Sequence, residues 1–212
     1  MNKTTDLAEY GYDAWLRYRM IEPGERRNEV YRLGGIVIEG TDEPVAHTAA
    51  RELSRGLSGM LGREVSIKER AGDAPFVVLG LLGHSPIIDG AFPEGEAGLR
   101  LGREGYALRH EPGSGRIAIG AETASGLLYG AFGLLRRIGT GHSLLGLDTA
   151  ERPANGLRML NQWDNIDGSI ERGYAGSSIF TKTTDSRRTW SAFATTRGSW
   201  PRRASMRFPS TT

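Results

Sequence analysis

Cysteine is absent from this chain of 212 residues, and histidine occurs only four times. Without cysteine, the chain cannot form a disulfide, a thiolate nucleophile or a cysteine-ligated zinc site. The histidines His47, His84, His110 and His142 stand singly, with no second ligand at helical or strand spacing. We therefore expect no bound metal and no cofactor. Sequence motifs for phosphate loops, dinucleotide binding and esterase nucleophiles are also missing.

The chain also lacks a long apolar run. No stretch approaches the roughly 20 apolar residues that a membrane-spanning helix requires. Residues 1–10 are polar and do not have the pattern of a secretory signal. These absences predict a soluble cytoplasmic protein without a membrane partner.

Leucine, isoleucine and valine are all missing from residues 181–212. This tail holds 13 Ser or Thr, and seven Lys or Arg against the single acid Asp185. Such a composition cannot bury a core, so we expect the tail to be disordered. Residues 1–180 hold 20 basic and 24 acidic side chains, so the basic excess lies entirely in the tail. The part before the tail therefore gives no sign of a surface for nucleic acid.

A minor alternative gives this tail a function as a cationic arm that binds nucleic acid or anionic surfaces. Two arginine pairs and two tryptophans would permit such binding: Arg187, Arg188, Arg202, Arg203, Trp190 and Trp200. Salt-sensitive affinity for DNA is the result that this alternative requires.

Apolar periodicity predicts an α/β domain over residues 1–152, with a mixed β-sheet and flanking helices. The predicted helices are residues 7–21, 43–60 and 123–138. The predicted strands are residues 33–39, 64–69, 76–82 and a hairpin of 105–111 with 115–120. Residues 83–98 and 139–155 are predicted to be loops. Gly126, Gly130 and Gly133 lie on or near one side of the last helix, which should let it approach a neighbour closely.

Polar and aromatic residues that suit a carbohydrate are concentrated in residues 161–168. Trp163 offers an apolar plate for the face of a sugar ring, while Asp164 and Asn165 offer hydrogen-bonding groups for hydroxyls. A capped, acid-rich turn with a buried tryptophan fits the composition about equally well. Asp164 and Asp167 could also be proposed as an acid and base pair, but spacing cannot establish it, since glycosidase carboxylates must face each other across the bond they cleave.

Three segments of the chain resemble the alpha-glucuronidases of glycoside hydrolase family 67. Residues 158–176, RMLNQWDNIDGSIERGYAG, resemble the segment that joins the N-terminal domain of that family to its catalytic barrel. Residues 11–18, GYDAWLRY, are similar to its opening helix, and residues 126–136, GLLYGAFGLLR, to the last helix of its N-terminal domain. The resemblance spans about residues 6–180, and Gln162 departs from it where the family often has histidine.

This resemblance implies an enzyme that hydrolyses the alpha-1,2 link of 4-O-methyl-glucuronic acid in xylan oligosaccharides, with inversion and without a metal. It implies an N-terminal domain similar to that of hexosaminidases, followed over residues 153–180 by a linker and the first strand, 157–160, of an incomplete (β/α)8 barrel. The catalytic carboxylates would come from later barrel strands, so we expect no catalytic residue in this chain. Trp163 would pack on the sugar ring, with Asp164 and Asn165 as its polar neighbours.

The abrupt change at residue 181 suggests that the chain is a truncated or frame-shifted product that is inactive alone. Translating the other reading frames downstream of the Phe180 codon tests this hypothesis. A homodimer is expected only of the full-length family. The alternative from another class is a carbohydrate-binding module that uses Trp163 without catalysis.

Overall fold

The computed structural model describes residues 18–70, 72, 75–158, 163–165, 167–174 and 176, with only the backbone for residues 25 and 26. Contacts between residues divide the chain into two compact units, Tyr18–Ala154 and a second unit that contains Asn155–Thr212. We call Tyr18–Ala154 the sheet unit. In the second unit, residues 163–176 with their gaps are called the hairpin segment.

The described residues of the sheet unit form a six-stranded mixed sheet in the order β2-β1-β3-β5-β4-β6. Strands β2, β1, β3 and β5 run parallel, whereas β4 is antiparallel to both β5 and β6. The strands are β1 (Gly35–Glu39), β2 (Ile67–Lys68), β3 (Phe76–Leu81), β4 (Tyr106–Glu111), β5 (Arg116–Ala121) and β6 (Asp148–Glu151). The predicted mixed α/β sheet with flanking helices is therefore confirmed.

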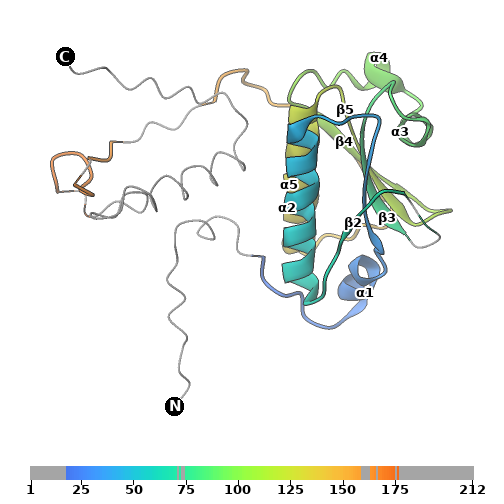
Figure 1. Ribbon diagram of the computed structural model, residues 1–212, viewed down its shortest axis with the longest axis horizontal. Coiled ribbons are helices and arrows are strands. Elements are labelled where there is room, and N and C mark those ends of the chain that lie inside the picture. The colour runs from blue at the N-terminus through green and yellow to red at the C-terminus, as the bar shows by residue number, and fades with distance from the viewer. Residues whose placement is uncertain are drawn as a thin grey trace. The chain divides into compact units, whose positions relative to one another are not determined.

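Helices cover both faces of this sheet (Figure 1). The long helices α2 and α5 pack side by side on one face, and the short helices α3 and α4 lie on the other side. The helices are α1 (Glu25–Tyr31), α2 (Pro44–Leu61), α3 (Pro86–Ala91), α4 (Gly95–Leu99) and α5 (Ala124–Gly139). Within the described residues, no helix has the length and apolar composition needed to cross a membrane.

The main core lies between the sheet and the pair α2 and α5. Ile36, Leu79 and Ile119 from neighbouring strands contribute to it, together with Leu53 of α2 and Leu127 of α5, and each has 0% of its surface exposed. A smaller core on the opposite face contains Val78 of β3 with Ile88 and Phe92 from the region of α3. Because β3 is covered on both faces, every residue of this strand is buried, as its continuous apolar sequence predicts.

Small residues bring α5 close to the sheet, as the sequence predicts. A methyl group added at Gly126 would lie 2.3 Å from the carbonyl oxygen of Gly105, and one at Gly130 would lie 2.5 Å from Ile119 Cγ2. Neither position has room for a side chain without movement of its neighbours. Glycine at these sites therefore sets how closely α5 can pack.

Two arginines link the region of α1 to the C-terminal end of α2. Arg27 of α1 donates to the Leu61 carbonyl at the end of α2 (2.9 Å). Arg63, just after α2, donates to the carbonyls of Tyr31 and Leu33 at and beyond the end of α1, each at 2.7 Å. The guanidinium carbons lie 5.7 and 4.7 Å from the centre of the Tyr31 ring. At each of the two helix ends, the last carbonyl therefore accepts a hydrogen bond from a guanidinium, whose positive charge also suits the negative end of the helix dipole.

Several predicted elements differ from the structure. Residues 83–98 contain α3 and the start of α4 rather than a continuous loop, and residues 139–155 contain β6. The predicted helix over residues 7–21 is not helical at residues 18–21, and its earlier residues lie outside the described ones. Helix α1 was not predicted. For the predicted barrel strand, Leu157 and Arg158 are in no strand, and residues 159–160 lie outside the described residues.

Candidate functional site

The hairpin segment carries the three residues that the sequence predicts to contact a sugar. Asp164 pairs with Ile170 in an antiparallel bridge, and the Glu171 amide donates to the Trp163 carbonyl (2.7 Å). The Asn165 amide donates to the Ser169 carbonyl (2.8 Å), which closes a turn next to this bridge. The described part of the polar run, residues 163–165, 167 and 168, therefore belongs to a hairpin.

Side chains of the turn hold this hairpin together. The Asn165 side-chain NH2 group donates to the Ser169 hydroxyl (2.8 Å) and to the Glu171 carbonyl. Because a side-chain amide has two N–H bonds, these contacts use its whole donor capacity. Asn165 is thus committed to the turn as a donor, and only its side-chain oxygen is left for a ligand.

Asp167 is also engaged within the turn. One of its carboxylate oxygens accepts from the Ser169 hydroxyl (2.6 Å) and from the Ser169 backbone amide (2.9 Å). These bonds, the hydroxyl contact first, lower the pKa of Asp167, because they favour the charged carboxylate. A carboxylate held in this way stays ionised and is poorly suited to donate a proton in catalysis.

Two aromatic side chains of the hairpin segment are exposed. Trp163 is 60% exposed, and Tyr174 is 76% exposed. The hydroxyl of Tyr174 interacts with the Glu171 carboxylate, which raises the pKa of the tyrosine. The alternative of a buried tryptophan is wrong, whereas the capped, acid-rich turn is present. Tyr174 lies in the motif that carries the family resemblance, yet the sequence alone did not single it out.

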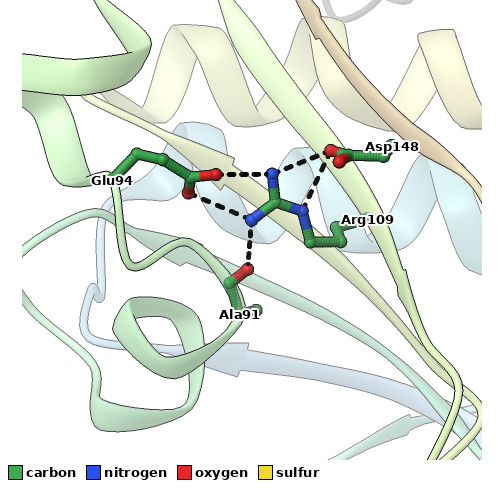
Figure 2. Close-up of polar contacts among 4 residues, drawn as sticks. All are labelled: Ala91, Glu94, Arg109 and Asp148. Atoms are coloured by element: carbon green, nitrogen blue, oxygen red, sulfur yellow. Dashed lines mark hydrogen bonds and ion pairs between the residues drawn. The ribbon is translucent and has the colours of Figure 1, made fainter.

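A separate polar cluster surrounds Arg109 of β4 in the sheet unit (Figure 2). Its Nη1 and Nη2 groups donate to the two carboxylate oxygens of Glu94, at 3.0 and 2.9 Å. Its Nε and Nη2 groups donate to Asp148 Oδ1, at 2.9 and 2.8 Å, and Nη1 also reaches the Ala91 carbonyl at 2.8 Å. The guanidinium carbon lies 5.1 Å from the centre of the Phe92 ring.

All five N–H donors of Arg109 are therefore used within the protein. The hydrogen bonds with Glu94 raise the pKa of Arg109 and lower the pKa of Glu94. A guanidinium with no donor left cannot bind a carboxylate or phosphate ligand without breaking an internal contact. The Arg109 cluster is thus a structural cross-link, and its partners, 15 and 39 residues away in sequence, explain why no motif indicated it.

A surface hollow of about 270 Å³ lies beside β6. It is slightly smaller than typical small-molecule sites, which begin near about 300 Å³. Its lining residues are Gly98, Leu99, Arg100, Leu101, Ala150, Glu151 and Arg152. The only carboxylate among them, Glu151, accepts a hydrogen bond from the Tyr106 hydroxyl (2.7 Å). This hollow therefore does not present two opposed carboxylates, and the described residues contain no cluster of His, Asp or Glu able to hold a metal.

Part of the sequence matches the model of a known protein family. A family model described as the N-terminus of glycosyl hydrolase family 67 matches residues 14–134, more than half of the sequence. The chain belongs to glycosyl hydrolase family 67. The model for the middle domain of this family matches residues 137–199, and so continues past Phe180, where the sequence predicts the family pattern to end.

Curated relatives of this family 67 chain are alpha-glucuronidases. A probable alpha-glucuronidase A of Aspergillus oryzae is 33% identical over 174 residues, which cover 82% of this chain and 20% of the relative. The alpha-glucuronidase of Hypocrea jecorina is 32% identical over 187 residues, covering 82% of this chain and 21% of the relative. The chain thus spans about a fifth of the length of the relatives it matches.

Two solved structures are similar to the family 67 chain at low identity. A family GH115 4-O-methyl-alpha-glucuronidase with specificity for decorated arabinogalactans is 19% identical with a TM-score of 0.47, covering 79% of this chain and 24% of the other. The N-acetyl-beta-hexosaminidase of Streptomyces plicatus is 20% identical with a TM-score of 0.39, covering 66% of this chain and 29% of the other.

Proposed function

We propose that this chain is the N-terminal part of an alpha-glucuronidase that removes 4-O-methyl-glucuronic acid from xylan oligosaccharides by inverting hydrolysis of the alpha-1,2 link. The observation that carries this proposal is membership of family 67, with relatives named alpha-glucuronidase. Within the full-length enzyme, the sheet unit would act as an accessory domain. Three further expectations stay predictions. They are the likeness of the sheet unit to the N-terminal domain of hexosaminidases, the start of a barrel over residues 153–180, and a cytoplasmic location.

Catalysis by this chain alone is not expected. Inverting glycosidases need a general acid and a general base, with their carboxyl groups about 6.5–9.5 Å apart across the scissile bond. Three carboxylates of the two described polar clusters are already engaged, since Glu94 and Asp148 bind Arg109 and Asp167 binds Ser169. We propose that the catalytic pair comes from the part of the relatives that this chain does not match.

Trp163 is the residue most suited to contact the sugar. Its exposed ring could pack on the C–H face of the uronic acid, while Asp164 and the side-chain oxygen of Asn165 would contact hydroxyl groups. Binding by this hairpin alone would be weak, because a sugar gains affinity from a pocket that surrounds it.

The activity of the chain is tested by incubating it with aldotetraouronic acid and measuring released glucuronic acid. The longer alpha-glucuronidase of Hypocrea jecorina serves as the positive control. We expect release by the control and none by this chain. Sustained release by this chain would contradict the proposal that its catalytic carboxylates are missing.

A second candidate function is a non-catalytic carbohydrate-binding module, which the exposure of Trp163 and Tyr174 favours. Titration with glucuronic-acid-bearing xylo-oligosaccharides, followed by tryptophan fluorescence, separates the two functions. Saturable binding that disappears in Trp163→Ala and persists in the control Trp190→Ala would support the module. A response that is linear up to millimolar sugar would favour the accessory part of an enzyme.

A further inference from the structure

Strand β6 is attached to the sheet without burying its side chains. Asp148, Ala150 and Glu151 are exposed, and Thr149 is half-buried. The strand lies at the edge of the sheet and pairs only with β4. Apolar burial, which stabilises most of the sheet, is therefore nearly absent at this strand.

Backbone pairing with β4 holds all four residues of β6, and Arg152, directly after the strand, donates to the Arg100 carbonyl (3.3 Å). Polar side chains add an anchor at each end of the strand. At the first residue, Asp148 accepts two hydrogen bonds from Arg109, which is itself held by Glu94 beyond α3 (Figure 2). At the last residue, Glu151 accepts a hydrogen bond from the Tyr106 hydroxyl (2.7 Å). Both anchors join β6 to β4, and both depend on the charge of a carboxylate.

The segment before β6 is fixed in a different way. Leu144 and Leu147 are 3% and 1% exposed and belong to the main core. The amide of His110 also donates to the Leu147 carbonyl (2.7 Å). The attachment of the chain therefore changes from apolar to ionic directly after Leu147.

We propose that Asp148–Glu151 is a detachable strap that leaves β4 by turning about Leu147 when its carboxylate anchors are weakened, while the other strands stay paired. The strap itself contributes little apolar surface to its attachment, because its own side chains are already in contact with solvent. Four released residues would lengthen the connection to the second unit by up to about 13 Å. Reversible release of the strap would in this way change the length of the linker between the two units.

Hydrogen exchange of the whole chain at neutral pH tests the strap. Asp148→Asn keeps the shape and the acceptor oxygen but removes the charge, and Glu151→Gln does the same at the other end. We expect the peptide that covers Asp148–Glu151 to exchange about fivefold faster in the double variant, with unchanged exchange in the peptide that covers β3. Added salt should accelerate hydrogen exchange of the strap more in the unsubstituted protein than in the double variant.

Glu111→Gln is the matched control. Glu111 forms an ion pair of 2.8 Å with Arg116 on the hairpin of β4 and β5, beyond the residues of β4 that pair with β6. Exchange of the strap should be unchanged in this variant. Equal acceleration by the control, or exchange of the strap at the same rate as β3 in every variant, would overturn the proposal. Since no substrate is involved, the outcome is independent of the proposed hydrolase function.

Discussion

In the sheet unit, β3 has every residue buried, whereas in the hairpin segment Trp163 and Tyr174 are 60% and 76% exposed. Burial of apolar surface stabilises the first region. The second is stabilised by side-chain hydrogen bonds, chiefly those of Asn165 and Asp167 to Ser169. The difference suits the proposed functions, because a supporting domain needs a stable core and a sugar-contacting surface needs accessible groups.

The largest effect expected from this contrast is a cavity in the main core. Leu79→Ala removes a fully buried side chain of β3 and should lower the free energy of unfolding by about 3 kcal/mol. Chemical denaturation measures this change in the free energy of unfolding. Leu145→Ala is the control, because Leu145 is 63% exposed and its loss should change stability little. An equal loss of stability in Leu79→Ala and Leu145→Ala would contradict the described core.

Close packing of α5 gives the next effect. Gly126→Ala places a methyl group 2.3 Å from the Gly105 carbonyl oxygen, which belongs to the backbone and cannot rotate away. We expect a loss of about 2 kcal/mol, since overpacking outweighs the better helix propensity of alanine. Gly90→Ala in α3 is the control, because nothing lies within 4 Å of its added methyl group. A stabilised Gly126→Ala protein would show that α5 packs less closely than described.

In the hairpin segment the effect should be local. Asn165→Ala removes the two side-chain N–H donors of Asn165, which together should contribute about 1 kcal/mol. Hydrogen exchange at Ile170 and Glu171 should accelerate, while the unfolding of the sheet unit stays unchanged. Asn155→Ala, an exposed asparagine without a described side-chain hydrogen bond, is the control. A fall in the stability of β3 would contradict a purely local role of Asn165.

The smallest effect concerns pH. Arg109 lowers the pKa of Glu94 below its ordinary value of 4.5, so the carboxylate form favours the folded state. This contribution is complete above the unfolded pKa and is lost as the pH falls through the lower, folded pKa. Glu94→Gln should therefore lose less stability than the unsubstituted protein between about pH 6 and about pH 3, by less than about 1 kcal/mol. Identical pH profiles from thermal unfolding would contradict this role of the Arg109 cluster.

Long apolar patterns in the sequence predicted the centre of the sheet unit well. The residues of α2, β3, α5 and the hairpin of β4 and β5 match their predicted ranges to within a few positions. Helix α3 was missed because it has six residues, too few for a helical period. A signal was nevertheless present, since Ser85 caps the helix and Pro86 occupies its first turn. Strand β6 was missed because Asp-Thr-Ala-Glu has no apolar alternation.

The candidate site could be located from sequence but its internal contacts could not. Trp163, Asp164 and Asn165 were predicted from residue types and family resemblance, and their binding role stays a prediction. The commitment of the Asn165 donors to the turn depends on hairpin geometry, which composition does not specify. The Arg109 cluster depends on strand register between β4 and β6, which sequence patterns determine only weakly at a polar edge.

The hydrogen bonds of Arg27 and Arg63 limit where this domain can be shortened. A version that starts after Tyr31 would lose Arg27, leaving the Leu61 carbonyl without its guanidinium donor, and would remove the helix end that Arg63 serves. The effect of the shorter terminus would then appear at the C-terminal end of α2, 34 residues from the lost Arg27. Expression boundaries should therefore be placed before α1, even though this short helix contributes little to the core.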